Sequence, residues 1–283
     1  RLALSIHDIV VTEAGFGADL GAEKALHIKT NASGLAPDCI VVNVTVRSMK
    51  MHGLGMVGLP NGKAALDEEN VEMVRHGAFA NLSRHIENMS RFGPDVIVSI
   101  NKFPSDSKAE ISAIMEIARD AGAADVALYE GHSKGSEGAT ELANAVSKAV
   151  QRHKAAGRPF NPLFEGDAPV IEKIEKIAKS MYGASGISVK PRAKKQLDKI
   201  DEWGYGNLPV CMAKTQYSFS HDPSKYGAPK DFTLPVREFR LNAGAGFVVA
   251  VCGDMMTMPG LPKIPAAVGM DMDKDGNLTG IFS

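Results

Sequence analysis

The stretch PDVIVSINKFPSDSKAEI, residues 94–111, decides the predicted fold. Its first part is a nearly continuous run of β-branched and aliphatic residues, Val96 to Ile100, which predicts a strand buried on both faces. A short polar turn follows, and SKAE then places Ser107 as a helix N-cap with Glu110 three residues later, the pattern of a capping box. A buried strand followed by a capped helix is the repeating unit of a parallel α/β sheet.

The same alternation extends on both sides of this stretch. We expect four strands in the first half of the chain: HDIVVTEAG (7–15), DCIVVNVTVRSM (38–49), PDVIVSINKF (94–103) and DVALYEG (125–131). Apolar residues at helical spacing predict helices over residues 68–91, 107–121 and 140–153. The sequence therefore predicts an α/β fold with a doubly wound, mostly parallel sheet.

The character of the chain changes after the third of these helices. A polar connection rich in proline and glycine leads to one clear helix, PVIEKIEKIAKSMYG (169–183), and the chain becomes loop-rich after Trp203. We expect two domains: an α/β domain over residues 1–156 and a smaller α+β domain over residues 157–283.

Composition narrows the classes of function. The 283 residues include 32 basic and 33 acidic side chains, and this balance argues against a protein that binds nucleic acid or a membrane surface. Cys39, Cys211 and Cys252 are odd in number and far apart, which favours free thiols in a reducing compartment over a redox or metal role. We therefore expect a cytoplasmic protein, with a mitochondrial one as the alternative.

A glycine-rich loop, VTEAGFGADLGAEK (11–24), precedes a predicted helix. Its glycines are one residue out of register with the dinucleotide-binding fingerprint, which is a weak signal even when it fits. Free backbone N–H groups at a helix start favour an anion, but Asp19 and Glu23 add negative charge that suits a cation or a capped helix better. A ligand-binding loop and a tight structural turn both remain open.

Two other motifs resemble known ligand sites but do not fit them. GLPNGKAA (58–65) contains Gly62-Lys63, but its glycine spacing is short and Ala64 supplies no hydroxyl for Mg²⁺, so we expect a surface turn rather than a P-loop. MDMDKDGNLTGIF (270–282) begins like a calcium-binding EF-hand loop, but Phe282 occupies the twelfth position in place of glutamate. A hairpin turn at DKDG is the better interpretation.

Candidate ligand groups follow three of the predicted strands. TVRSMKMHG places Arg47, Lys50 and His52 just past a strand, where cations suit a phosphate or carboxylate; a solvated loop is the alternative. NKFPSD places Phe103 where it can stack on a flat ring and Asp106 where it can accept hydrogen bonds. The alternative for this pair is a core phenylalanine beside a turn-forming aspartate.

GHSKGSEGA adds His132 and Lys134 after the last predicted strand; a polar surface loop is the alternative. The carboxyl ends of parallel strands meet at one edge of the sheet, which is where ligands bind in open α/β folds. With the glycine loop, all four strands direct possible ligand groups toward that edge. This convergence is stronger than any single motif.

Taken together, these segments resemble one enzyme family across essentially the whole chain. The similarity is carried by VTEAGFGADLGAEK, TVRSMKMHG, SRHIENMSRFG, NKFPSDSKAEI, NLPVCMAKTQYSFS and the AGAGF, MTMPGLP and PAA segments near the end. The family is formate–tetrahydrofolate ligase, also called 10-formyltetrahydrofolate synthetase.

The resemblance implies a ligase that joins formate to tetrahydrofolate with ATP and Mg²⁺, through formyl phosphate, and that monovalent cations activate. The family's P-loop lies N-terminal to the matched region, so the chain resembles the C-terminal half of the enzyme. We expect it to need the P-loop segment as a partner, to be inactive without it, and to form a homo-oligomer.

The resemblance also implies roles for particular residues of the folate site. Phe103 matches one member of an aromatic pair that holds the pterin ring, and His132 stands where the family has the tryptophan partner. A histidine can still stack on a pterin with less area than an indole, so we expect weaker folate binding or a changed preference. Asp106 is expected to bond the amino edge of the ring.

The remaining implied roles belong to catalysis and to the nucleotide. Arg47 and Lys50 are expected to contact formate or phosphate, and Glu13 to orient a cation or a lysine. The loop residues Gly15, Phe16 and Gly17 are expected to help shape a nucleotide pocket; no metal ligands are assigned.

Two other functions compete with this interpretation. The first is a non-catalytic folate-binding or oligomerising module, which the histidine at position 132 favours. The second is a nucleotide-cofactor oxidoreductase. The off-register glycines, and the lack of a ribose-binding acid after a second strand, weigh against that second function.

Overall fold

The computed structural model describes residues 1–57, 66, 68–253, 263–274, 276 and 278–279. The chain divides into two compact units, residues 1–253 and residues 254–283. The GLPNGKAA segment (58–65) and Phe282 lie outside the described residues.

A three-stranded parallel sheet forms the centre of the first part of unit 1. Its strands are β1 (Cys39–Val44), β2 (Asp95–Asn101) and β3 (Asp125–Tyr129), in the order β1-β2-β3. Val42 of β1 lies opposite Val98 of β2, which in turn lies opposite Val126 of β3. The central strand β2 is buried on both faces through Ile100, as its continuous apolar run predicts.

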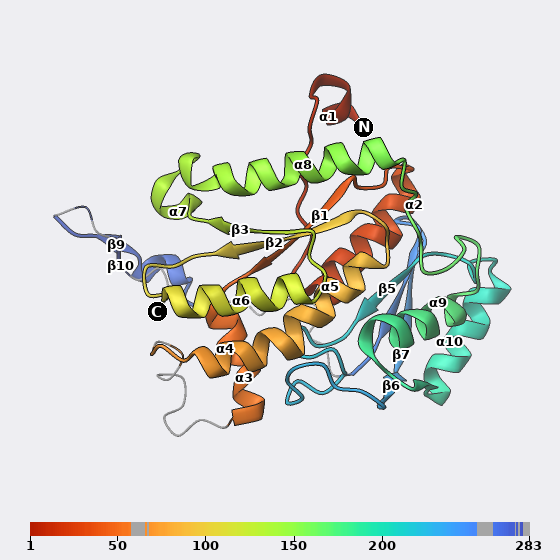
Figure 1. Cartoon of the computed structure of the whole chain (residues 1–283). Helices are drawn as coiled ribbons and strands as arrows, with labels where there is room; N and C mark the ends of the chain where they lie inside the picture. The colour runs from red at the N-terminus through yellow and green to blue at the C-terminus, as the bar shows by residue number, and fades with distance from the viewer. Residues whose placement is uncertain (58–65, 67, 254–262, 275, 277, 280–283) are drawn as a thin grey trace. The chain divides into compact units, whose positions relative to one another are not determined.

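Helices cover both faces of this sheet (Figure 1). On one face α8 (Thr140–Ala156) packs Ala145 and Ala149 against Ile97 of β2 and Ala127 of β3. The other face packs against α4 (Val71–Gly77), α5 (Ser83–Ser90) and α6 (Lys108–Asp120) within the main core. The predicted doubly wound α/β fold is confirmed.

The helix predicted over residues 68–91 is also confirmed, with a π-helical turn, η4 (Ala78–Leu82), between α4 and α5. Asn70 caps it, because its side chain accepts a hydrogen bond from the Met73 amide at 2.9 Å. The capping box of α6 is present as predicted, with Ser107 and Glu110 each bonded to the other's backbone N–H.

Two helices of this layer pack with their backbones in close contact. α3 (Val46–Val57) and α4 pack so closely that a Cβ added to Gly77 would lie 1.8 Å from the Met49 carbonyl oxygen. A Cβ added to Gly53 would lie 2.0 Å from the Met73 carbonyl oxygen. Only glycine permits this approach at both positions.

The strand predicted over residues 7–15 is wrong. The chain begins with a short helix, α1 (Leu2–Ile6), and the residues that follow run without a strand partner in the described part of the chain. Ile9 is 61% exposed and Val11 is 84% exposed. The β-branched run fits a strand, but strand preference depends on a neighbouring strand and on burial, and neither occurs here.

The glycine loop opens directly into a helical segment over residues 17–33. It consists of η1 (Gly17–Ala22), η2 (Ala25–Lys29) and α2 (Thr30–Ser33), with π-helical geometry in the first two. The second predicted strand is shorter than its apolar run, since β1 ends at Val44 and α3 takes up the residues from Val46.

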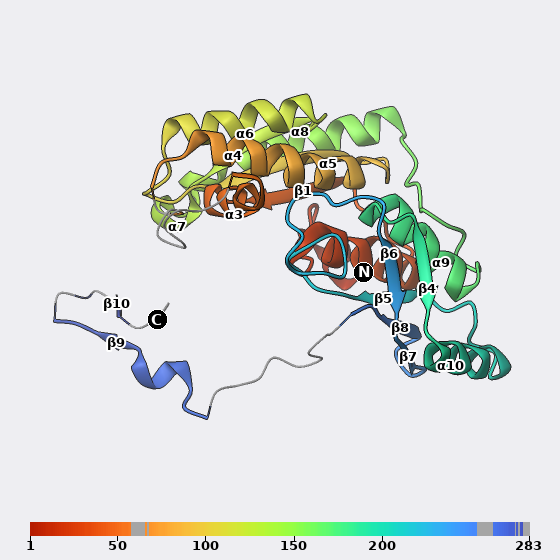
Figure 2. The same ribbon diagram turned by 90° about the horizontal axis from the view of Figure 1, so that it is seen from below.

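The later part of unit 1 contains two small sheets. β4 (Gly186–Val189) and β6 (Thr233–Val236) form a parallel pair, and the second sheet has the order β5-β8-β7, from β5 (Val210–Ala213), β8 (Phe247–Val251) and β7 (Glu238–Asn242). The helices α9 (Val170–Ile177), η6 (Ala178–Tyr182) and α10 (Pro191–Glu202) lie beside these strands (Figure 2). One continuous hydrophobic core joins this part to the first sheet, and the domain boundary after residue 156 stays a prediction.

Short elements complete the described chain. α7 (Gly131–Lys134) and η5 (Glu137–Ala139) follow β3, and unit 2 contains η7 (Ala266–Gly269), β9 (Asp271–Met272) and β10 (Leu278–Thr279). The antiparallel pairing of β9 with β10 confirms the predicted hairpin in place of an EF-hand. In the described residues, no helix is long and apolar enough to cross a membrane.

Candidate functional site

A pocket of about 300 Å³ lies at the carboxyl ends of two neighbouring parallel strands, β2 and β3. Its lining residues come from the two loops that follow these strands: Asn101, Lys102, Phe103, Pro104, Glu130, His132 and Ser133. This is the sheet edge at which the sequence predicts ligand groups, and the structure brings Phe103 and His132 into one cavity there.

The loop after β2 presents Phe103 as one wall of the pocket. The Phe103 amide donates a hydrogen bond to Asp106 Oδ2 at 2.8 Å, and the Asp106 amide donates to the Phe103 carbonyl at 3.0 Å. This closed turn leaves Phe103 48% exposed. Because exposed apolar surface is unfavourable in water, a ligand that covers the phenyl ring gains free energy. Burial, reinforced by the neighbouring Glu110, raises the pKa of the Asp106 carboxyl.

Asp106 is not among the residues that line the pocket. In this structure its carboxylate shapes the turn that carries Phe103, which is the structural alternative that the sequence left open. Its predicted bond to the amino edge of a pterin stays a prediction.

A buried ion pair is bonded to the backbone directly after this turn, through the amide of Ser107. Lys50 Nζ lies 2.7 Å from Glu110 Oε1, and both side chains are almost fully buried. Glu110 also accepts hydrogen bonds from the amides of Asn70 at 2.8 Å and Ser107 at 3.1 Å. Burial opposes the charged form, but the bonds from Lys50, Asn70 and Ser107 outweigh it and hold the pKa of Glu110 below its ordinary value.

The two predicted catalytic cations therefore differ in their surroundings. Lys50 is committed to Glu110 and to the carbonyls of Leu66 and Glu68, at 3.3 and 2.7 Å. Arg47 is exposed in the first turn of α3. Neither residue lines the pocket, and their catalytic roles stay predictions.

The loop after β3 forms the second wall and is organised by the backbone of Glu130. Its carbonyl accepts hydrogen bonds from the amides of Ser133 at 3.1 Å and Lys134 at 3.0 Å, and its amide donates to the Gly138 carbonyl at 2.9 Å. These bonds fold the segment that carries His132 into the short helix α7. The imidazole of His132 is thereby exposed at the pocket.

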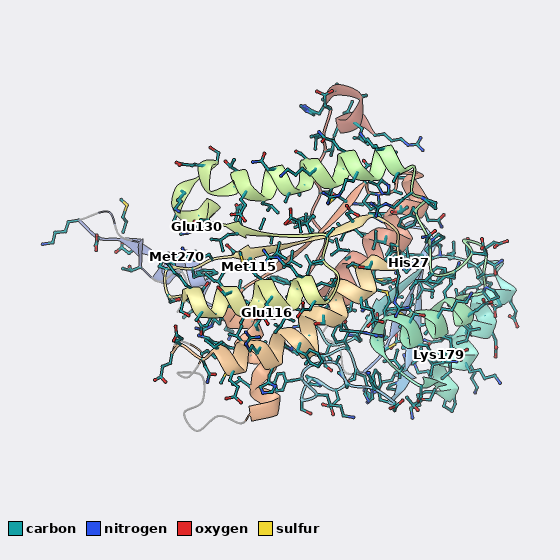
Figure 3. The ribbon with its side chains drawn as sticks, viewed as in Figure 1. His27, Met115, Glu116, Glu130, Lys179 and Met270 are labelled. Atoms are coloured by element: carbon teal, nitrogen blue, oxygen red, sulfur yellow. The ribbon has the colours of Figure 1, made fainter. Side chains whose placement is uncertain are left out.

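The side chain of Glu130, labelled in Figure 3, pairs with lysines from both loops. Its Oε1 lies 2.9 Å from Lys102 Nζ, and its Oε2 lies 2.7 Å from Lys134 Nζ. Hydrogen bonds from Lys134 and then Lys102 lower the pKa of Glu130. The sequence analysis did not single out Glu130; its place directly after the apolar run of β3 is the signal that would have found it.

The predicted nucleotide loop does not follow a strand, because residues 7–15 form none. Gly17 has a positive φ of 72°, and a Cβ on Gly21 would lie 1.9 Å from the Gly15 carbonyl oxygen, so the loop folds tightly back onto η1. Phe16 is 93% exposed at its tip, and Glu13 is exposed before it. Close backbone contact favours a tight turn, and a nucleotide-binding role stays a prediction.

A buried pair joins this helix to a distant segment, and the sequence analysis missed it. Lys214 Nζ lies 2.7 Å from Asp19 Oδ2, with both side chains almost fully buried. The ammonium also donates to the carbonyls of Thr215 and Ser218 and lies 4.8 Å from the centre of the Tyr182 ring. The negative charge of Asp19 is therefore paired with a lysine of the same chain.

Two half-buried histidines, His52 and His85, lie near the same aspartate. Burial, together with the nearby His85, lowers the pKa of His52 from 6.5 to about 4, and burial also lowers the pKa of His85. Both side chains are therefore neutral at physiological pH. Within the part of the chain that the structure describes, no group of three or more histidine, cysteine, aspartate or glutamate side chains is arranged to hold a metal ion.

Comparison with known proteins identifies relatives over the full chain. Residues 1–282 match the family model described as formate–tetrahydrofolate ligase. The chain is 49% identical over 282 residues to a formate–tetrahydrofolate ligase of Ruegeria sp. (strain TM1040), covering 100% of this chain and 49% of that protein. It has the same identity and coverage with the ligase of Paracoccus denitrificans (strain Pd 1222). The chain thus spans about half the length of the curated relatives it matches.

Proposed function

The chain belongs to the formate–tetrahydrofolate ligase family, and from this we propose that it forms part of an ATP-dependent ligase that joins formate to tetrahydrofolate. In the proposed reaction a formate oxygen attacks the γ-phosphorus of ATP, which releases ADP and gives formyl phosphate. A tetrahydrofolate nitrogen then attacks the formyl carbon, phosphate leaves, and the nitrogen loses its proton to give 10-formyltetrahydrofolate.

The observation that carries this proposal is the pocket between the loops after β2 and β3. Phe103 supplies an exposed aromatic wall, and His132 supplies a second flat side chain from the other loop. A planar ring between them gains stacking contact and covers the phenyl face that the free chain leaves in water. We propose that the pterin ring of tetrahydrofolate binds there.

The phosphate chemistry places different demands on the protein. Phosphoryl transfer needs positioning and positive charge around the transferring oxygens, with little covalent help from side chains. We propose that Arg47, which is exposed, and Lys50, which is paired with Glu110, contact formate or phosphate. Mg²⁺ would supply charge neutralisation for ATP, and we assign no metal ligand to this chain.

We also propose the remaining family properties for the complete enzyme. The phosphate-gripping P-loop would belong to the part of the relatives that this chain does not span, and Glu13 and the Gly15–Gly17 loop would border the nucleotide. Monovalent-cation activation, a homo-oligomer and a cytoplasmic location follow the same reasoning. The chain by itself would then bind tetrahydrofolate without forming ADP.

The test is tetrahydrofolate binding by the purified chain, measured by calorimetry. Stacking on one aromatic side chain contributes about 1 kcal/mol or more beyond area burial, so we expect Phe103→Ala to weaken binding by about tenfold. Phe79→Ala is the matched control, because Phe79 is 73% exposed and does not line the pocket. Equal affinity of wild type and Phe103→Ala would refute the assignment of the pocket.

A second measurement separates the ligase from a non-catalytic module. The native polypeptide that contains this chain is assayed for ADP release with and without formate. Formate-dependent release supports the ligase. Tetrahydrofolate binding without any ADP release by that polypeptide would support a folate-binding module instead.

A further inference from the structure

Glu130 holds one lysine from each wall of the pocket. Lys102 belongs to the loop after β2, which carries Phe103, and Lys134 belongs to the loop after β3, which carries His132. The Glu130 side chain is 18% exposed, against 32% for Lys102 and 54% for Lys134. The more shielded of the two pairs is therefore the one that crosses between the loops.

The crossing contact supplements one backbone bond at the base of the two loops. The Lys102 amide donates to the Tyr129 carbonyl at 3.0 Å, which continues the ladder between β2 and β3 for one residue. Beyond it the chains diverge, into the Phe103 turn on one side and α7 on the other. Beyond that point, the Lys102–Glu130 pair provides a side-chain contact between the two loops.

Other charges nearby do not replace this contact. Asp106 lies close enough to Lys102 to interact with it electrostatically, but its carboxylate is bonded to the Phe103 amide. Glu137 acts on Lys134 in the same way from η5. Both belong to the same loop as the lysine that they influence, so neither links the two walls.

We propose that Glu130 is a positioning residue that fixes the spacing between Phe103 and His132 by tying Lys102 to the opposite loop. The proposal rests on the function proposed above, since it concerns the same ring-binding pocket. A fixed spacing matches the pocket to one planar ring, and the free pocket then loses less conformational freedom when that ring binds. Without the tie, the pocket would have to be ordered by the ligand itself.

A surface ion pair usually contributes little to the stability of the fold. The positioning role is therefore tested by ligand binding and not by stability. Glu130→Gln and Lys102→Met both remove the tie. We expect each variant to bind pterin, the ring without its tail, about three- to fivefold more weakly, as followed by pterin fluorescence. Lys102→Arg keeps a cation of similar reach and is expected to restore affinity to within about twofold of wild type.

The matched control is Arg75→Met. Arg75 pairs with Glu116 at 2.6 Å across α4 and α6, so this variant also removes an exposed ion pair between two elements, but away from the pocket. We expect its pterin affinity to equal that of wild type. Any general effect of losing an ion pair would appear in this variant as well.

A ligand-free measurement completes the test. Amide hydrogen exchange over residues 131–136 should be faster in Lys102→Met than in wild type, and unchanged in Arg75→Met. If wild type binds pterin and Lys102→Met binds it equally well, the positioning role is wrong while the proposed function stands. If wild type does not bind pterin at all, the proposed function fails and the positioning role fails with it.

Discussion

Lys50 is the residue whose predicted role differs most from the contacts that it makes in the structure. Its pattern, a lysine just past a strand, predicts a cation that faces a ligand. In the structure the same lysine neutralises Glu110, whose other bonds cap α6 and meet the start of α4. A sequence cannot show this, because the choice between ligand and carboxylate depends on which helix packs against α3.

We predict that Lys50→Met destabilises the chain by about 3 kcal/mol, because it leaves the Glu110 carboxylate buried without its charge partner. Urea unfolding followed by circular dichroism gives the free energy of unfolding. Arg75→Met, which breaks an exposed pair, should change the free energy of unfolding far less than Lys50→Met does. A loss for Lys50→Met as small as that for Arg75→Met would show that Glu110 is stabilised by the backbone amides instead.

His52 gives the pH dependence at this scale. Its pKa falls from 6.5 in the unfolded chain to about 4 in the folded chain, chiefly because it is buried. The unfolded state therefore binds more protons between these values, so stability is full above pH 6.5 and declines as the pH falls toward 4. We expect His52 to account for a loss of about 2 kcal/mol between pH 7 and pH 5.

The measurement is the free energy of unfolding of wild type and His52→Gln at both pH values. The variant should show a smaller loss, with the remainder arising partly from His85, whose pKa burial also lowers. An identical pH dependence in the two proteins would mean that His52 is not the group that titrates.

At the scale of elements, the predictions succeeded where the residues of a segment are sufficient to specify the element that it forms. The central strand β2 and the capped helix α6 follow from an apolar run and a capping box, and both are observed. The segment 7–15 shows the limit, since its β-branched residues predict a strand but have no strand to pair with in the described chain. A strand forms only beside a second strand, and the sequence of one segment does not show which strand will pair with it.

The crossing of α3 and α4 yields an element-scale prediction. A methyl group at Gly77 would overlap the Met49 carbonyl, so Gly77→Ala must push the helices apart and should cost about 3 kcal/mol in unfolding free energy. Gly186→Ala is the matched control, because nothing lies within 4 Å of its added Cβ. Equal stability of the two variants would show that the crossing adjusts without cost.

At the scale of the whole molecule, the sequence predicted where ligand groups gather better than which groups they are. The edge at the carboxyl ends of β2 and β3 follows from topology, and Phe103 and His132 do meet there. Glu130 and the Asp19–Lys214 pair were not predicted, because their roles depend on contacts with residues from other segments. Pairs that are distant in sequence are set by packing, which a single sequence does not display.

The Asp19–Lys214 pair provides the prediction at this scale. It joins the helical segment at residues 17–33 to the segment after β5, and both side chains are almost fully buried. We expect Lys214→Met to destabilise unit 1 by about 3–5 kcal/mol, because Asp19 would stay buried and uncompensated. Adding Asp19→Asn should recover part of that loss in the double variant, measured in the same urea experiment. No recovery would place the energy in the bonds of Lys214 to Thr215 and Ser218.

The same pair has a consequence for folding during synthesis on the ribosome. About 195 residues separate its two members, and ribosomes add roughly 5–20 residues per second, so Asp19 is made about 10–40 s before Lys214. Throughout that interval Asp19 has no access to the lysine that pairs with it in the folded chain. We therefore expect the buried arrangement of Asp19 to form only after Lys214 has been made.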